Sequence, residues 1–493
     1  MNSSSLKCIP QWFVSALLLA LVPLAWALTP VEVAKLIASD GAAGDDFGKS
    51  VAVDGDTVLI GAPYDDDNGL QSGSAYIFTR RGGVWTERAK LTASDATAND
   101  FFGYAVALDG DTALIGAAYE GDNGIGSGSA YVFTRSGGVW AEQAKLTASD
   151  GGEGDNFGWS VGLDGDAALV GAWRSDVKGL NSSGAAYVFT RNAEVWTQQA
   201  KLTASDAASG DCLGFSVALA GDTALIGAMY EGANGFWSGS AYVFTRSAAV
   251  WTEEAKLTAS DGAVGDNFGW SVALSDSTAL IGAHYDGDSD GSETGSAYVF
   301  TRNAGVWTQQ AKLTAADASS FDYFGEAVAI DGDAALIGAN GDDDNGMSSG
   351  SAYIFTRSGG VWTEQAKLTS SDAAKGDNIG LSVVIDGDTA LIGTPVTDDS
   401  SGSVYIFSLN AAKVVPIDIK PGTETNSINP NSNGRVAVAI LTAGEFDALQ
   451  LDPYTAKFGP SGATAERYTV KDLDRDGDED LLLYFRIQQT GMA

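Results

Sequence analysis

Hydrophobic and polar positions alternate in short runs along most of the chain, and the same arrangement of runs returns at a nearly constant interval. The dipeptide Lys-Leu closes one run of each copy. It begins at Lys35, Lys90, Lys145, Lys201, Lys256, Lys312 and Lys367, so the interval is 55 or 56 residues. Each interval holds four runs rich in β-branched and aromatic residues, which predict β-strands. Four strands in a repeat of this length indicate a β-propeller blade rather than a helical solenoid unit.

The second copy shows the four predicted strands, at residues 104–108, 112–117, 129–134 and 139–147. The first two are joined by Asp109-Gly110, a two-residue hairpin signal because Gly accepts the positive φ of a type I′ turn. The last two are joined by an equally short turn. The remaining two connections are long and acidic, so we predict short turns at one end of each blade and elaborated loops at the other. Binding residues usually lie on such loops.

The two ends of the repeated region are incomplete in complementary ways. Residues 31–36 match the last strand of a copy, although no first three strands precede them, and the seventh copy stops after its third strand at residues 405–407. We therefore predict that the N-terminal strand completes the seventh blade and removes two open sheet edges. The predicted fold class is all-β: a seven-bladed propeller over residues 28–411, closed by the N-terminal strand, and a small β-rich domain over residues 412–493.

The copies resemble FG-GAP repeats, the blades of the integrin α-subunit propeller and of many secreted bacterial proteins. The FG element stands at Phe47-Gly48, Phe102-Gly103, Phe157-Gly158, Phe268-Gly269 and Phe324-Gly325, with Leu213-Gly214 and Ile379-Gly380 as departures. The second element is complete at Gly61-Ala62-Pro63 and shortened elsewhere. The resemblance implies a binding or adhesion function. The calcium loop that such repeats often carry is reduced here to Asp-Gly-Asp or less, so we expect no such sites in the blades. The IDIKPG and SINPNSNG segments of the second domain resemble a C-terminal β-module of secreted bacterial proteins.

The N-terminus and the net charge bear on location and partners. Lys7, an apolar stretch at residues 12–24 and Ala25-Trp26-Ala27 predict a signal peptide over residues 1–27. We expect a secreted or cell-surface protein, extracellular or periplasmic, with no membrane insertion after cleavage, and a monomer. The net charge of -36 argues against nucleic acid as a partner. The acidity either keeps the protein soluble or favours cations and basic partners. Cys212 is the single thiol after residue 27, so no internal disulfide is expected.

An acidic segment near the C-terminus has the spacing of a calcium loop. Its carboxylates are Asp472, Asp474, Asp476, Asp478 and Asp480. Oxygen donors at positions 1, 3, 5 and 9 of the segment and a glycine at position 6 are typical of sites for this hard cation. Position 12 is Leu483 rather than the bidentate Glu of an EF-hand. Calcium is therefore the expected cofactor, and a solvated acidic turn is the alternative.

Comparison of the copies with one another reveals aromatic positions at the elaborated end. They follow either the FG element or the Gly-Ala pair, and they are Tyr104, Trp159, Phe215, Trp270, Trp173, Tyr230 and Tyr285. Aromatic rings around a central channel suit stacking on sugars or contact with protein side chains, so we predict a protein or glycan ligand there. The alternative is that these rings plug the mouth of the disc.

Each connection between copies also carries two aspartates, such as Asp40 and Asp45. Capping of backbone amides explains this repetition, and weak cation binding, there or at residues 65–67 and 342–344, is the alternative. Enzyme signals are few: His284 is the only histidine, and no nucleophile motif is present. We expect a non-catalytic binding or adhesion protein. A structural component of a surface assembly and, third, a paired-carboxylate glycosidase are the alternatives.

Overall fold

The structure is a computed structural model. It describes residues 28, 30–287, 293–409, 417–419, 435–440, 457–458, 463–472 and 480–486. The chain divides into two compact units, residues 1–410 and 411–493, a boundary one residue from the predicted one. The predicted signal peptide, residues 1–27, lies outside the described residues. No helix in the part of the chain that the structure describes is long and apolar enough to span a membrane.

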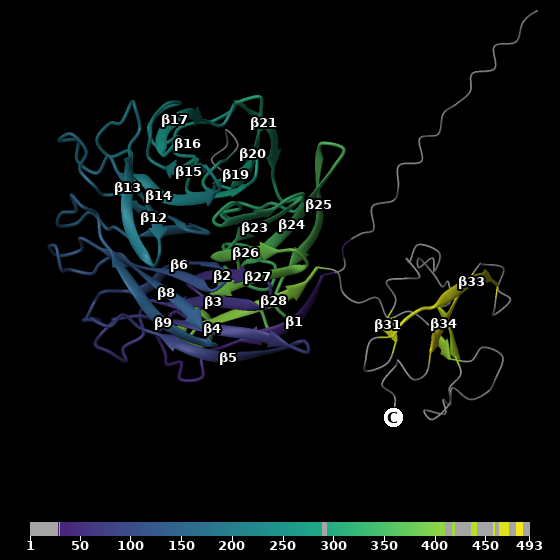
Figure 1. Cartoon of the computed structure of the whole chain (residues 1–493). Coiled ribbons are helices and arrows are strands. Elements are labelled where there is room, and N and C mark those ends of the chain that lie inside the picture. The colour runs from purple at the N-terminus through teal and green to yellow at the C-terminus, as the bar shows by residue number, and fades with distance from the viewer. Residues whose placement is uncertain are drawn as a thin grey trace, which may run out of the picture. The chain divides into compact units, whose positions relative to one another are not determined.

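Seven four-stranded antiparallel sheets make up the first unit (Figure 1). Six of them run in chain order: β2 to β5 (Ser50–Asp54, Thr57–Ala62, Ser74–Arg81, Val84–Leu91), β6 to β9 (Phe102–Asp109, Thr112–Ala117, Ser129–Ser136, Val139–Leu146), β10 to β13 (Ser160–Asp164, Ala167–Ala172, Ala185–Asn192, Val195–Leu202), β14 to β17 (Leu213–Ala220, Thr223–Ala228, Ser240–Ser247, Val250–Leu257), β18 to β21 (Ser271–Ser275, Thr278–Ala283, Ser296–Asn303, Val306–Leu313) and β22 to β25 (Val328–Asp331, Ala334–Ala339, Ser351–Ser358, Val361–Leu368). The all-β propeller prediction is confirmed, with strand ends that differ from the predicted ones by one or two residues.

The seventh sheet takes its fourth strand from the other end of the repeated region. Its order is β26 (Ser382–Asp386), β27 (Thr389–Thr394), β28 (Ser403–Ser408) and β1 (Val31–Leu36), with a four-residue helix α1 (Thr397–Ser400) between β27 and β28. β1 pairs antiparallel with β28. A backbone bridge joins Phe47 to Gly402, as Phe102 is joined to Gly73 in the next pair of sheets. The first strands of neighbouring sheets contact one another, and β2 contacts β26 in the same way.

The repeated Phe-Gly and Gly-Ala elements form the contact between neighbouring sheets. Phe102 is fully buried, with its ring centroid 5.5 Å from that of Tyr131 and 5.9 Å from that of Phe133 in its own sheet, and its backbone bridges to Gly73 of the preceding sheet. A Cβ atom on Gly61 would lie 2.0 Å from the carbonyl oxygen of Gly103, which itself has a φ of +93°. No larger residue fits at either glycine, because backbone rather than a movable side chain occupies the space. The motif is thus a packing device.

Each part of the hydrophobic core lies between two sheets. The second strands, such as β7 and β11, are buried along their whole length, and one cluster joins Leu114 of β7 to Val170 of β11 and Tyr187 of β12. On the outside, Ser39 donates its backbone N–H and its hydroxyl to the carboxylate of Glu87, both at 2.9 Å. The same contact recurs between other neighbouring sheets, so polar contacts on the outside join these sheets in addition to the hydrophobic core between them.

The second unit contains a sheet with the order β29 (Ile417–Ile419), β30 (Arg435–Ile440), β34 (Asp480–Arg486) and β33 (Arg467–Lys471). β31 (Lys457–Phe458) pairs with β32 (Ala463–Thr464). Alternate residues of β34 are buried, namely Leu481, Leu483 and Phe485. The strand therefore has one core face, as the period of two predicts. The predicted small β-rich domain is confirmed.

Candidate functional site

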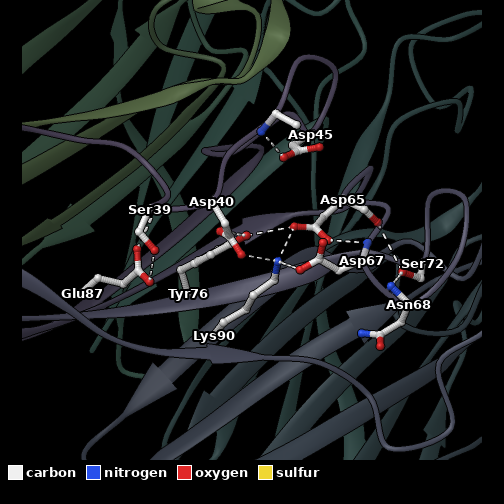
Figure 2. A network of polar contacts seen from close by, with 11 residues as sticks. Ser39, Asp40, Asp45, Asp65, Asp67, Asn68, Ser72, Tyr76, Glu87 and Lys90 are labelled. Atoms are coloured by element: carbon white, nitrogen blue, oxygen red, sulfur yellow. Dashed lines mark hydrogen bonds and ion pairs between the residues drawn. The ribbon is translucent and has the colours of Figure 1, made fainter.

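The elaborated end of the disc, which we call the upper face, carries the loops that follow the second and fourth strands of each sheet. A lysine lies among carboxylates there (Figure 2). The ammonium of Lys90 contacts Asp40 at 2.8 Å, Asp65 at 2.8 Å and Asp67 at 2.5 Å. The hydroxyl of Tyr76 donates to Asp40 and Asp65, both at 2.9 Å. Although burial opposes it, these hydrogen bonds lower the pKa of Asp40 and raise the pKa of Lys90.

We call this group of a lysine, a tyrosine and the carboxylates around them the lysine cluster. It recurs around the disc and determines the role of the two aspartates in each connection between copies. The first aspartate of each loop binds the lysine and the tyrosine, as Asp95 binds Lys145 at 2.7 Å and Tyr131 at 2.7 Å. The second caps a turn, as Asp45 accepts the N–H of Ala42 at 2.6 Å. The capping prediction is confirmed for the second aspartate. The first aspartate also accepts a backbone hydrogen bond, and it has a further role that was not predicted, because the lysine from a strand about 50 positions later reaches it.

The same cluster bears on the alternative of cation binding. Ligand oxygens of Asp317, Asp342 and Asp344 lie within 4.8 Å of one another, close enough to share a metal ion. The ammonium of Lys367 contacts all three, at 2.9, 2.6 and 2.5 Å. A side-chain cation thus occupies the position that a metal would take. The third sheet is different, because Ser175 replaces the buried carboxylate and accepts from Lys201 at 3.4 Å.

Four of the predicted ligand residues form a continuous aromatic arc at the centre of the upper face. Tyr104, Trp159, Phe215 and Trp270 come from consecutive sheets, with successive ring centroids 4.5, 5.6 and 4.7 Å apart. Trp173 joins them, at 5.2 Å from Trp159. All five are half-buried. Since these rings pack on one another, their geometry favours the plug interpretation for the centre of the disc.

Charged residues complete the central group. Lys49 and Glu326 occupy the positions that follow the Phe-Gly pair in the first and sixth sheets. Burial raises the pKa of Glu326 to about 7, while the charge of Lys49 and a hydrogen bond from Trp270 oppose the shift. Burial lowers the pKa of Lys49. Its ammonium also lies 5.6 Å from the ring centroid of Tyr104.

The remaining two predicted ligand residues lie away from the arc. Tyr285 contacts His284, with ring centroids 3.9 Å apart, and His284 contacts Trp270 at 4.1 Å. His284 is buried, and burial lowers its pKa to about 3, so it is neutral near pH 7. Tyr230 lies 5.2 Å from Trp237, a residue that the sequence analysis did not identify.

Tyr230 and Trp237 belong to a cavity of about 500 Å³ between the β10–β13 and β14–β17 sheets. Its aromatic lining consists of Trp173, Tyr230 and Trp237, and its polar lining includes Asp155, Arg174, Asp176 and Ser182. A second cavity, of about 520 Å³, lies at the opposite end of the same two sheets. Arg191 and Asp166 in that second cavity form a pair that other sheets repeat, as Arg80 and Asp56 do. The lower cavity is therefore part of the repeated scaffold.

The upper cavity lies where two copies depart from the others. The third copy has Arg174 where the first, second, fourth and fifth copies have tyrosine, and the fourth has Phe236-Trp237 where the first has Leu70-Gln71. Trp237 has a φ of +59°, a left-handed conformation that costs a bulky residue about 1–2 kcal/mol. Its side chain is 45% exposed and that of Phe236 is 67% exposed. The fold gives no reason for these rings, and comparison of the loops among copies would have found them.

The predicted calcium loop lies mostly outside the described residues. Residues 473–479 are among those not described, and they include Asp474, Asp476 and Asp478. Asp472 directly follows β33, and Asp480 begins β34. Lys471 pairs with Asp480 across the two antiparallel strands. The ends of the acidic segment are therefore held together.

The fold and the upper face together define a repeat propeller with a recessed aromatic and acidic surface among its loops. The chain matches the family model described as FG-GAP repeat at residues 30–78, 85–133, 140–189, 196–244, 251–300, 307–355 and 362–407. It belongs to this family. No curated protein matches the sequence. Among solved structures, one from "Crystal Structure of Mitotic Checkpoint Complex" is similar at 11% identity and a TM-score of 0.47, over 83% of this chain and 98% of that one.

Proposed function

We propose that this protein is a secreted or cell-surface binding protein, without catalytic activity, that recognises a protein or glycan ligand through its upper face. The observation that carries the proposal is the upper cavity, where Trp173, Tyr230 and Trp237 come together at loops that depart from the repeat. Concave sites with aromatic walls and a few polar groups are typical of ligand recognition. The family supports the same class, because FG-GAP propellers often serve binding or adhesion.

The chemistry of the buried ionisable groups also favours binding over catalysis. A proton-transfer residue works best when its pKa lies near the working pH and it reaches the substrate. His284 is buried and has a pKa of about 3. Glu326 has a pKa of about 7, which suits proton transfer. The charged group that interacts with it is Lys49, however, whereas a glycosidase places a second carboxylate there.

The test compares ligand capture by the two ends of the disc. The protein is applied to arrays of glycans and of extracellular proteins, and each captured ligand is measured again with two sets of variants. Trp173→Ala and Tyr230→Ala alter the upper cavity, whereas Val139→Ser and Val306→Ser alter exposed positions in the short turns at the lower end. We expect the upper variants to reduce capture about tenfold or more and the lower ones to leave it unchanged. Capture of nothing, or a loss confined to the lower variants, would contradict the proposal.

We also propose that the acidic segment of the second unit binds calcium through Asp472, Asp474, Asp476, Asp478 and Asp480. The pairing of β33 with β34 supports this proposal, because it brings the two ends of the segment together. Carboxylates forced close to one another repel until a cation neutralises them. Calcium at about 100 times its dissociation constant should stabilise the unit by about 2.7 kcal/mol. Calorimetry with Asp474→Asn should show no such calcium-dependent gain.

A further inference from the structure

We infer that the upper cavity between the β10–β13 and β14–β17 sheets binds one or two units of a neutral saccharide. This inference rests on the proposed function and assigns a ligand class to one part of the upper face. The volume of about 500 Å³ falls within the range of about 300–1,000 Å³ for small-molecule sites. The cavity is open to the loop end of the disc, where a glycan chain can continue outward.

The aromatic lining supplies apolar faces at an angle to one another. Trp237 is tilted by 35° against Tyr230, with centroids 5.2 Å apart, and it remains 45% exposed. Phe236, which is not part of the cavity lining, stacks on Trp237 at 4.4 Å. The ring of a sugar has a face of C–H groups that packs on such surfaces, while its edge carries hydroxyls. Aromatic rings arranged around a concave surface therefore fit a flat, partly apolar, polyhydroxylated ligand better than a flexible chain.

The polar lining offers both hydrogen-bond donors and acceptors, which a hydroxyl group needs. Glu153, Asp155 and Asp176 present carboxylates, and Arg174 presents a guanidinium, which lies 4.5 Å from the ring centroid of Trp173. An anionic ligand would be repelled by the three carboxylates. A sugar hydroxyl can donate to these carboxylates and accept from Arg174. The donor and acceptor set thus fits an uncharged sugar.

The lining groups are held in place by contacts of their own. Asp176 accepts the N–H of Ser182 at 2.8 Å, and Asp155 accepts the N–H of Gly152 at 2.9 Å. The backbone carbonyls of Phe236 and Trp237 accept N–H groups from the loop of the next sheet, at 3.1 and 3.0 Å. Little conformational freedom remains to be lost when a ligand binds, which favours affinity.

The decisive variant is Trp237→Gly. Glycine adopts a left-handed φ without strain, so this change should remove the indole while the melting temperature stays equal or rises. Gln71→Gly is the matched control, because Gln71 occupies the same loop position in the first copy with a φ of +54°. It does not line the cavity.

The full chain is titrated with glucose, galactose, mannose and N-acetylglucosamine, and with glucuronate and choline as charged probes, by ligand-observed NMR and tryptophan fluorescence. We expect at least one neutral sugar to bind, with affinity reduced about tenfold or more in Trp237→Gly and unchanged in Gln71→Gly. Cavity-dependent binding of glucuronate or choline alone overturns the assignment. If the arrays capture ligands and Trp237→Gly leaves that capture unchanged, the saccharide assignment is also overturned, although the proposed function then stands. If no ligand is captured at all, both fail.

Discussion

The lysine cluster of the sixth sheet allows a sharp test of what holds the upper face together. Lys367→Met keeps the length of the side chain and removes its charge. The change leaves Asp317, Asp342 and Asp344 facing one another within 4.8 Å. The side chain of Asp342 is only 4% exposed, whereas those of Asp317 and Asp344 are 46% and 66% exposed. Most of the cost therefore falls on Asp342.

The magnitude follows from this difference in burial. Loss of one partner of a buried ion pair costs about 3–5 kcal/mol, and each exposed pair contributes about 0–1 kcal/mol. The hydroxyl of Tyr353 still donates to Asp342 at 2.9 Å, so we expect a loss near the lower limit, about 3 kcal/mol. Lys201→Met is the matched control, because Lys201 contacts the exposed Asp150 and Ser175. It should cost about 1 kcal/mol.

Tryptophan fluorescence during thermal unfolding reports on the propeller alone, since no tryptophan follows Trp362. The melting temperature of Lys367→Met should fall below that of Lys201→Met by roughly 2–3 °C, because a domain of this size has an unfolding entropy of about 0.8 kcal/mol/K. Millimolar calcium should raise the melting temperature again, because carboxylate oxygens within 4.8 Å of one another can share a calcium ion with bonds of about 2.4 Å. The parent's propeller transition should not respond to calcium.

The pH dependence gives a second readout. Burial opposes the shift, but hydrogen bonds from Lys367 and Tyr353 lower the pKa of Asp317. Its stabilisation is therefore present above the ordinary pKa of 3.8 and is lost as the pH falls through the lowered value. The difference in melting temperature between the parent and Lys367→Met should therefore become smaller as the pH falls over that range. Equal melting temperatures of the two methionine variants at pH 7, with no calcium response, would refute the reasoning.

Three further predictions concern other parts of the disc. Deletion of Val31–Leu36 leaves the edge of β28 unpaired, so cooperative unfolding should be lost or aggregation should appear in light scattering; a deletion variant as stable as the parent would contradict the pairing. Trp159→Ala removes a half-buried ring of the arc and should cost about 2–3 kcal/mol in urea unfolding while sugar binding persists; loss of binding with full stability would favour a ligand role instead. Asp266→Asn should raise the melting temperature at pH 7.5 and leave it unchanged below pH 3.8. Burial raises the folded-state pKa of Asp266 to about 6, so its charge destabilises the fold fully above that value and not at all below 3.8. A gain at every pH would show that charge is not the cause.

The sequence by itself determined the repeat, the strands and the role of the N-terminal strand. Hydrophobic alternation and Asp-Gly turns are local signals, so strands such as β7 and β11 follow from them directly. The missing fourth strand of the seventh copy and the extra strand at residues 31–36 could be matched by counting, and β1 pairs with β28 as expected. The Phe-Gly and Gly-Ala elements identified the repeat, although their reason, a contact between backbones of adjacent sheets, is spatial.

Only the tertiary structure decided what the acidic loops and the aromatic rings do. Asp40 and Asp65 lie about 50 and 25 positions before Lys90, and no local pattern says that one ammonium neutralises both. Most of the predicted aromatic residues belong either to a packed arc, in which neighbouring sheets bring Trp159 against Tyr104, or to a cavity, which Tyr230 lines with Trp237. Trp173 belongs to both, because it contacts Trp159 and also lines the cavity. Ring packing and cavity shape depend on the distance between sheets, which the order of residues within one repeat does not contain.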